Sequence, residues 1–382
     1  MISQRALQVS PFLAMEVLEE AQRMERQGEH IIHLEIGEPD FDTPPSVVEA
    51  AVEALRAGQT HYTHSMGVYD LRQAICDDYG RRYGVGVAPE QVVVTQGTSP
   101  ALFLVFAALL EPGDEVILSN PYYACYPNYI TFAGGAPVYV DIHEEEGYQL
   151  EAAEIAKMIT PRTKVILINS PANPTGAVLT ADRMAAIADL GPMVVSDEIY
   201  HGLVYEGRDH SILEYTSHAC ALNGFSKLYA MTGWRLGYII APREIARVLQ
   251  SIHQNFFISA SAFVQAAGLA ALRGEGCLDD VESMRQIYAE RRLFMLDRLS
   301  QIGLTTPEPP TGAFYVLVNI KRYCEDSLSF AFELLHEAKV AAAPGIDFGS
   351  NAEGYLRFSY ATSKGNIAEG LDRLGRYLAR KG

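Results

Sequence analysis

Cysteine is scarce in this sequence, and the five cysteines that occur are widely separated. Cys76, Cys125, Cys220, Cys277 and Cys324 are odd in number and show no Cys-X-X-Cys spacing. A disulfide framework or a zinc site needs paired or clustered cysteines. We therefore expect five small buried side chains, no metal site, and a location in the reducing cytoplasm.

Basic side chains and long hydrophobic runs are also in short supply. Lysine and arginine number 30 against 47 aspartates and glutamates, which gives a formal net charge of −17. This charge argues against nucleic acid or an anionic membrane as the main partner. The longest apolar runs, such as residues 101–110, are too short to cross a bilayer. Residues 1–7 lack the apolar stretch expected of a signal peptide.

Short apolar runs, rich in valine and isoleucine, recur through the first two thirds of the chain. They lack strict alternation, which is typical of strands buried on both faces of a sheet. The predicted strands are residues 92–95, 115–119, 164–169, 193–196 and 236–240. Helical patterns lie between them, including residues 43–58, where Thr43 is the expected cap, and the apolar residues 101–110. Strands that alternate with helices predict a mostly parallel α/β sheet flanked by helices.

The pattern changes after about residue 275. A long charged helix is predicted at residues 281–301, and strands at residues 312–318 and 355–360, with helices before and after the second strand. The 382 residues exceed one typical core, so a second, smaller α+β domain is expected here.

Lys227 stands in the most informative segment of the chain, residues 223–237. A lysine amine can form a Schiff base with a carbonyl, and Ser226 and Arg235 can hold a phosphate. Pyridoxal phosphate (PLP) offers both an aldehyde and a phosphate, and it needs a carboxylate against its ring nitrogen. A lysine considered alone is usually a surface side chain, but Phe225 and Leu228 place this one in an apolar setting.

Asp197 is the candidate for that carboxylate. It follows a run of valine and methionine, where an unpaired charge is costly. A protonated ring nitrogen at ~4 Å would attract it by about 4 kcal/mol at an effective dielectric constant near 20. A protonated ring stabilises negative charge at the α-carbon of a substrate. If Asp197 stood without the other motifs, a helix cap would be the better interpretation of it. Tyr200, three residues further on, can donate to the phenolic oxygen of the same ring.

Other polar residues fall at the carboxyl ends of predicted strands, where open parallel sheets bind ligands. Thr98 and Ser99 precede the apolar helix and offer hydroxyls beside free amides, which suits a phosphate. On their own they are better explained as a plain helix cap. Asn173, in the octapeptide at residues 169–176, can donate to the phenolic oxygen, and ordinary turn chemistry is the alternative.

Tyr123 and Arg357 complete the candidates. Tyr123 can stack on a pyridine ring, although core packing is more frequent for a single tyrosine. Arg357 lies in an apolar run and needs an anion, either a substrate α-carboxylate or an internal salt bridge. The candidates for the wall of a substrate pocket, with core packing as the alternative, are Phe12, Met66, Tyr315 and Phe348.

Together these motifs resemble the class I/II PLP-dependent aminotransferases of fold type I, over nearly the whole length. The most specific are Ser226-Lys227, Met-Thr-Gly-Trp-Arg-Leu-Gly at 231–237, and Asn-Pro-Thr-Gly at 173–176. The resemblance implies an α/β fold with a mostly parallel central sheet flanked by helices and a smaller α+β domain. The implied parts are an N-terminal arm at 1–14, a small domain at 15–43 and 276–382, and a large PLP-binding domain at 44–275.

The resemblance also implies roles for individual residues. Lys227 would hold the cofactor, with Asp197 on the ring nitrogen and Tyr200 as the third catalytic residue. Arg357, Asn173 and Gly37 would bind the substrate α-carboxylate. The residues implied for cofactor binding are Thr98, Ser99, Tyr123, Asn173, Asp197, Tyr200, Ser226, Lys227, Arg235 and Tyr62.

Tyr62 looks like the family tyrosine that reaches the phosphate of the neighbouring subunit. This implies a homodimer with shared active sites and an N-terminal arm that packs on the partner. The chain departs from many relatives at Gly224, where they have a second serine, and at Thr98-Ser99, where others have a lysine.

The implied reaction is the transfer of an amino group between an L-amino acid and a 2-oxo acid by a ping-pong mechanism, with Lys227 as nucleophile and base. The alternative on the same fold and cofactor is a carbon–sulfur β-lyase or a related elimination or cyclisation enzyme. A non-catalytic regulator would need a DNA-binding module, for which the chain has no basic segment. A serine hydrolase is excluded because the segment around Ser226 lacks the closing glycine of a nucleophile elbow.

Overall fold

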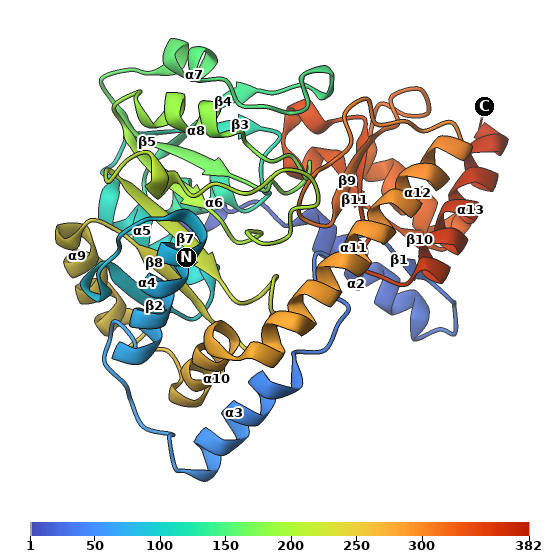
Figure 1. Ribbon diagram of the computed structural model, residues 1–382. Coiled ribbons are helices and arrows are strands. Elements are labelled where there is room, and N and C mark those ends of the chain that lie inside the picture. The colour runs from blue at the N-terminus through green and yellow to red at the C-terminus, as the bar shows by residue number, and fades with distance from the viewer. Residues whose placement is uncertain (1, 382) are drawn as a thin grey trace.

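The computed structural model describes residues 2–381, without the side chain of residue 275. Figure 1 shows a larger part built around one sheet and a smaller part at the opposite side, with the long helix α11 (Glu275–Gln301) between them. Helix α11 begins six residues before the predicted start at residue 281. No described helix combines the length and the apolarity needed to cross a membrane.

The larger part contains a seven-stranded sheet in the order β2-β8-β7-β6-β5-β3-β4. Strand β8 is antiparallel to both of its neighbours, and the other pairs are parallel, so the predicted sheet is confirmed. The strands are β2 (Val92–Thr95), β3 (Glu115–Asn120), β4 (Ala136–Asp141), β5 (Thr163–Asn169), β6 (Met193–Asp197), β7 (Ala219–Gly224) and β8 (Gly237–Ile240).

The prediction missed two of these strands. Strand β4 lies at the edge of the sheet, is mostly exposed or half-buried, and contains Pro137, so it has no apolar run. Strand β7 is fully buried but consists mainly of small residues, Ala-Cys-Ala-Leu-Asn-Gly, which do not resemble a β-branched strand.

Helices cover the sheet, and the central one is α5 (Thr98–Leu109), which contacts β7, β8 and α9. It begins at Thr98 instead of after Pro100, because proline is tolerated in a first turn whose amides have no helical partner. Thr98 and Ser99 are therefore part of the helix. The remaining helices of this part are α3 (Pro45–Arg56), α4 (Tyr69–Tyr83), α6 (Tyr126–Phe132), α7 (Ala152–Met158), α8 (Ala181–Ala188), α9 (Arg243–Phe256) and α10 (Ala262–Arg273).

Thr43 does not cap α3, contrary to the prediction. The N-cap position is Pro44, and none of the side chains that the structure describes caps the helix. The Thr43 hydroxyl instead donates to the carbonyl of Ala230 at 2.6 Å and accepts from the Trp234 indole at 2.9 Å. A long-range contact has replaced the local one, and it ties the start of α3 to the loop after Lys227.

The smaller part has two small sheets. Strand β1 (Ile32–His33) pairs in parallel with β10 (Val340–Ala341), while β12 (Tyr355–Ser359) lies between β11 (Ala343–Pro344) and β9 (Tyr315–Asn319) in antiparallel register. Its helices are α2 (Leu13–Glu25), α12 (Ser327–Ala338) and α13 (Lys364–Lys381). The predicted small α+β arrangement at the end of the chain is thus observed.

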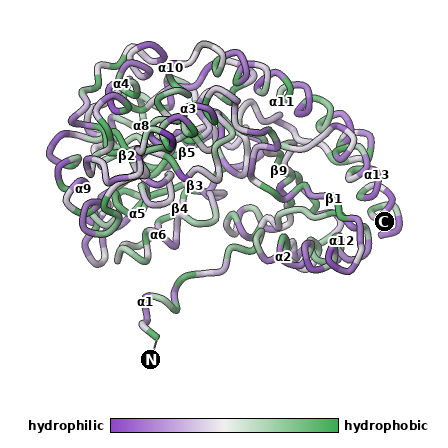
Figure 2. The backbone as a smooth tube through the Cα atoms, turned by 90° about the horizontal axis from the view of Figure 1, so that it is seen from below, coloured by the Kyte–Doolittle hydropathy of each residue, from purple (hydrophilic) through white to green (hydrophobic). Residues whose placement is uncertain are grey.

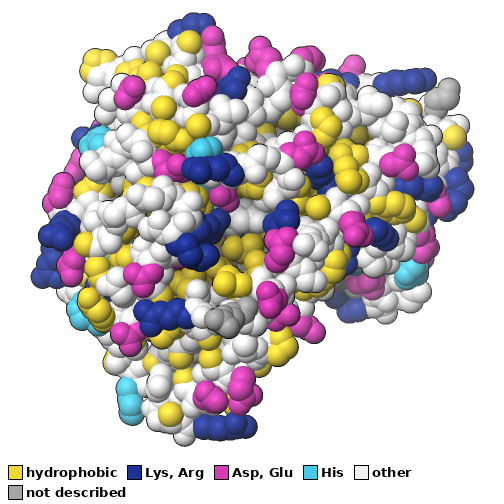
Figure 3. All heavy atoms as spheres, viewed as in Figure 1, with side chains coloured by type: hydrophobic (Ala, Val, Ile, Leu, Met, Phe, Trp, Pro, Cys, Tyr) yellow, Lys and Arg dark blue, Asp and Glu magenta, His cyan; other side chains and the backbone are white. Residues whose placement is uncertain are grey.

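The segment before α2 extends away from the body of the molecule in Figure 2 and contains the short helix α1 (Gln4–Leu7). Ser10 is held to Asn128 of α6 by two hydrogen bonds of 3.0 Å. On the face in Figure 3, Lys and Arg side chains are interspersed with Asp and Glu, and hydrophobic side chains lie between them.

The cysteines are free, and three of them, Cys76, Cys220 and Cys277, are buried. Cys125 and Cys324 are only partly buried, so the expectation that all five are buried was wrong for these two. Cys125 precedes α6 and Cys324 lies in a loop of the smaller part, where neither is enclosed on all sides.

Candidate active site

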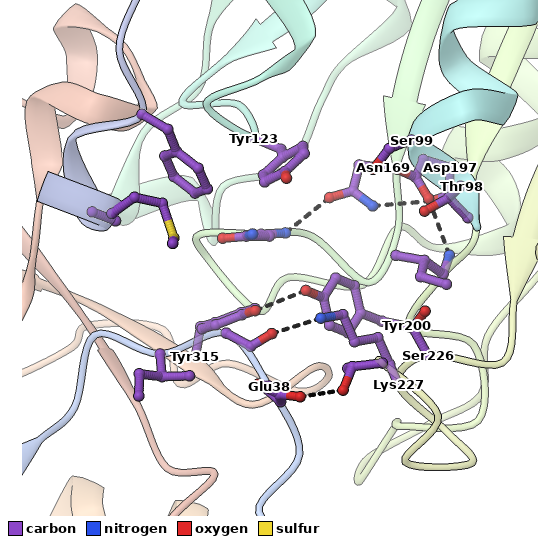
Figure 4. A pocket seen from close by; sticks show the side chains of 18 of the residues that line it. Glu38, Thr98, Ser99, Tyr123, Asn169, Asp197, Tyr200, Ser226, Lys227 and Tyr315 are labelled. Carbon is purple, nitrogen blue, oxygen red and sulfur yellow. Dashed lines mark hydrogen bonds between the residues drawn. The ribbon is translucent and has the colours of Figure 1, made fainter. Parts of the chain in front are cut away.

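A pocket of about 360 Å³ lies where the carboxyl ends of β5 and β6 meet α2 and β12 of the smaller part. In Figure 4, Thr98, Ser99 and Asp197 lie toward one end of the cavity, and Tyr315 and Glu38 toward the other, with Lys227 and Tyr200 between. The predicted residues that line it are Gly37, Thr98, Ser99, Tyr123, Asn173, Asp197, Tyr200, Ser226, Lys227, Arg235 and Arg357. Tertiary structure therefore brings eleven of the twelve predicted site residues to one cavity.

Lys227 lies on the loop after β7, and its Nζ donates to the carbonyl of Gly37 at 2.6 Å. Burial lowers the pKa of this amine from its usual 10.5 to about 8, and the positive charges of Arg357 and Arg235 act in the same direction. Glu38 and Asp197 oppose the shift. An appreciable fraction of the amine is therefore neutral near neutral pH, as a nucleophile or a proton acceptor requires.

Asp197, the last residue of β6, is 4% exposed. It accepts from the Tyr126 hydroxyl at 2.8 Å and from the Ile199 amide at 3.2 Å. Burial raises its pKa to about 6, against these two hydrogen bonds, and it forms no ion pair with any described residue. A buried carboxylate in this state is stabilised by a cation, so Asp197 fits the protonated ring nitrogen of PLP.

A cluster of donors surrounds the first turn of α5. Thr98 and Ser99 are its first two residues, and Ser226 and Arg235 line the same cavity. Gly97 has φ +96°, and a Cβ added to it would lie 2.5 Å from Arg235 Nη2, so only glycine permits this close approach. Hydroxyls, a guanidinium and free amides at a helix N-terminus fit a phosphate group.

The middle of the pocket contains tyrosines and asparagines. The Tyr200 hydroxyl is 2.8 Å from the Tyr315 hydroxyl. The rings of Tyr123 and Tyr126 pack edge to face, with their centroids 5.3 Å apart. Asn169 accepts from the Asn173 amide at 2.9 Å and donates to the Asp197 carbonyl at 3.0 Å. Asn169 thus joins two predicted site residues.

Arg357, in β12, is 2% exposed and lies against the rings of Tyr315 and Phe348, with its central carbon 4.3 and 4.9 Å from the ring centroids. It donates to Asn173 Oδ1 at 2.9 Å and to the Glu35 carbonyl, while its Nε has no hydrogen-bond partner in the described part of the chain. The internal salt bridge considered as its alternative partner is absent from residues 2–381. A buried guanidinium with no carboxylate partner fits a substrate carboxylate.

Tyr62 is the predicted site residue that the structure does not bring to this pocket. Its side chain is 85% exposed, in a loop whose next residue, Thr63, donates through its amide to the Ser259 hydroxyl at 3.3 Å. Of the four candidates for the pocket wall, Phe12 and Tyr315 line the cavity, whereas Met66 and Phe348 are core residues.

Sequence reasoning missed Tyr126 and Asn169, which contact Asp197, and Glu38, which lines the pocket and accepts from Thr232. The tyrosines at 122, 123 and 126 and the first residue of the 169–176 octapeptide were the available signals. Among the residues that the structure describes, no group of three or more His, Cys, Asp or Glu side chains is placed to hold a metal ion.

The chain is similar to known aminotransferases over nearly its whole length. The family described as aminotransferase class I and II matches residues 29–374. A (5-formylfuran-3-yl)methyl phosphate transaminase of Methanocaldococcus jannaschii is 41% identical, over 99% of this chain and 100% of that protein. An aspartate/prephenate aminotransferase of Thermus thermophilus is also 41% identical, over 99% of each chain.

A solved structure of aspartate aminotransferase from Thermus thermophilus with maleate has a TM-score of 0.95 and 40% identity, covering 98% of this chain and 99% of that chain. These matches confirm the predicted fold and favour amino-group transfer over the carbon–sulfur β-lyase alternative. The chain belongs to the class I and II aminotransferases, enzymes that depend on PLP and move an amino group between an amino acid and a 2-oxo acid.

Proposed function

We propose that each pocket residue has the role expected of it from the sequence. Lys227 holds the cofactor and moves the proton of the substrate α-carbon, which its lowered pKa supports. Thr98, Ser99, Ser226 and Arg235 hold the phosphate. The bound cofactor supplies an electron-withdrawing ring that stabilises negative charge at the α-carbon.

The remaining roles concern the ring and the substrate. Asp197 supplies a fixed negative charge opposite the ring nitrogen, and Tyr200 and Asn173 donate to the phenolic oxygen. Tyr123 packs on the ring face. Arg357 binds the substrate α-carboxylate, together with Asn173, to which it is already hydrogen bonded at 2.9 Å, and the backbone at Gly37. The proposed orientation of the substrate depends most on one observation, the buried Arg357 guanidinium that forms no ion pair with a described carboxylate.

We also propose that the preferred amino donors have neutral, apolar side chains. The side-chain end of the pocket is lined by Phe12, Met15, Leu18 and Ile36. The only Lys or Arg side chains on the described lining of the cavity are Lys227, Arg235 and Arg357, which the cofactor and the α-carboxylate occupy. Glu38 adds negative charge at this end, whereas the Glu35 carboxylate is paired with His33 at 2.7 Å, so a second substrate carboxylate lacks a counter-charge from the same subunit.

The test is a donor comparison in the half-reaction, without any oxo acid, followed by the visible absorbance of the bound cofactor. Phenylalanine is expected to react at least about tenfold more efficiently than aspartate, which corresponds to roughly 1.4 kcal/mol. Arg357→Lys should lower both efficiencies because it lacks the planar fork, while the exposed Arg243→Lys should change neither. Equal or better use of aspartate by the wild-type protein would contradict the proposed substrate class.

We propose that the protein is a homodimer with shared active sites and that it is cytoplasmic. Large apolar side chains are exposed on the arm, at Tyr62, and on or just after α9; they are Ile2, Leu7, Val9, Tyr62, Val248, Phe256 and Ile258. Contact with a second copy would cover such residues and bring Tyr62 to the partner's pocket.

The five free cysteines support the proposed cytoplasmic location. We also propose an arm at 1–14, a small domain at 15–43 and 276–382, and a large domain at 44–275; helix α2 begins at Leu13 and so includes the last two residues of this arm.

Sedimentation velocity tests the dimer. The protein should sediment at twice the mass of one chain, and removal of residues 1–10 should shift it toward the single-chain mass at low concentration, because the exposed apolar side chains of the arm are lost. A full-length protein that sediments as a single chain at all concentrations is the contrary result.

A further inference from the structure

Helix α2 borders the pocket, but its own sequence does not cap it. The N-cap position is Phe12, which has no side-chain acceptor for the free amides of the first turn. The acceptor comes from the far end of the chain. Asp347 accepts from the Leu13 amide at 3.0 Å through Oδ1 and from the Ala14 amide at 2.9 Å through Oδ2.

Asp347 lies in the short turn η4 (Gly345–Phe348), which joins β11 to β12. It is 8% exposed and forms no ion pair with a described residue. Both carboxylate oxygens are therefore committed to α2, where the partial positive charge of a helix N-terminus stabilises them.

The turn η4 contacts both Arg357, which is proposed to bind the substrate α-carboxylate, and the first turn of α2, which borders the apolar wall of the pocket. Phe348 packs under the Arg357 guanidinium, 4.9 Å from its central carbon, and its carbonyl accepts from the Tyr122 amide at 3.0 Å. One residue earlier, Asp347 holds the turn of α2 that places Phe12 and Met15 on the pocket wall. The Phe12 ring in turn contacts the Tyr123 ring edge to face, with centroids 6.1 Å apart.

We propose that Asp347 is a positioning residue for substrate selection. By capping α2 it sets the position of the apolar wall relative to Arg357, so that a donor bound by its α-carboxylate meets Phe12 and Met15 with its side chain. This rests on the proposed binding of the α-carboxylate by Arg357. Asp347 itself does not line the pocket, and its effect is transmitted through the first turn of α2.

The test compares Asp347→Ala and Asp347→Asn with the wild-type holoenzyme. The first measurement is amide hydrogen exchange of α2, and the second is the half-reaction efficiency for phenylalanine and for alanine. Asp347→Ala should raise exchange in the first turn of α2 and lower the efficiency with phenylalanine about tenfold, but lower that with alanine by less than about twofold. Asp347→Asn, which keeps one acceptor oxygen, should be intermediate.

Asp326→Ala is the matched control. Asp326 caps α12 by accepting from the Ser329 amide at 2.9 Å, is exposed, and does not line the pocket. Its loss should lower the melting temperature without changing the ratio of the two efficiencies. The comparison of phenylalanine with aspartate in the wild type tests the proposed substrate class, and the change of the phenylalanine-to-alanine ratio in the variants tests Asp347, so the two can fail separately.

The proposal is overturned if the phenylalanine-to-alanine ratio in the Asp347 variants stays at the wild-type value, whether or not the melting temperature falls. It is also overturned if α2 exchanges as slowly in Asp347→Ala as in the wild type. If Asp347→Ala does not fold, Asp347→Asn decides by the same two measurements.

Discussion

Replacing Lys227 by alanine is expected to lower the rate of amino-group transfer by at least about 10⁴-fold, because the substitution removes both the covalent anchor of the cofactor and the base that moves the α-proton. The structure places Nζ inside the pocket with a pKa of about 8, and no other described lysine lines this cavity. Steady-state transfer from phenylalanine to pyruvate measures the loss, and reduction with borohydride followed by peptide mapping locates the attached residue.

Lys157→Ala is the matched control, since Lys157 is exposed and paired only with Glu154 at 2.6 Å. It should retain wild-type activity. A small primary amine added to the Lys227→Ala protein is expected to restore part of the proton transfer. Full turnover by that variant without an added amine, or attachment of the cofactor to another residue, would show that the assignment of Lys227 is wrong.

Asp197→Asn is expected to lower the half-reaction rate by roughly 10³-fold. Asparagine has the shape of aspartate, and its oxygen can still accept from Ile199 or Tyr126, so the change mainly removes the negative charge. A unit charge at ~4 Å and an effective dielectric constant near 20 contributes about 4 kcal/mol, and each 1.36 kcal/mol is a factor of ten. Rapid mixing of the holoenzyme with an amino donor measures the rate.

Tyr126→Phe is the comparison that separates charge from hydrogen bonding at this site. It removes one neutral donor to Asp197 and should cost roughly 1 kcal/mol, or about fivefold to tenfold in rate. If Asp197→Asn reacted within tenfold of the wild type, or no more slowly than Tyr126→Phe, the fixed charge would not be what stabilises the reacting ring.

Much of the fold was predictable because buried strands have a local signature. Strands β2, β3, β5, β6 and β8 correspond to runs of valine, isoleucine and leucine, which form strands wherever both faces are covered. Strand β7 occupies an equally central position with small side chains, and its neighbours β6 and β8 on either side determine its conformation. The cap expected of Thr43 failed for the related reason that a tertiary contact to Ala230 replaced the local one.

The candidate site could be predicted from the sequence because its proposed reactive residues belong to short motifs at strand ends. Lys227, Asp197 and Arg235 each belong to a segment whose residue types suit an aldehyde, a ring nitrogen or a phosphate. The supporting residues lack such motifs. Tyr126 lies 71 residues from Asp197, and Asp347 lies 333 residues from the amide of Ala14 that it accepts from.

The sequence by itself thus determined the class of fold and the cofactor, and it supplied the candidates for the reacting side chains. Only the tertiary structure decided that Arg357 has no carboxylate partner among the described residues and that Phe12 and Met15 form a wall of the pocket. It also decided that Asp347 accepts hydrogen bonds from the first turn of α2. The physical reason is range: strand and helix patterns reflect sterics and burial among neighbouring residues, whereas a shared pocket depends on how distant segments pack against one another.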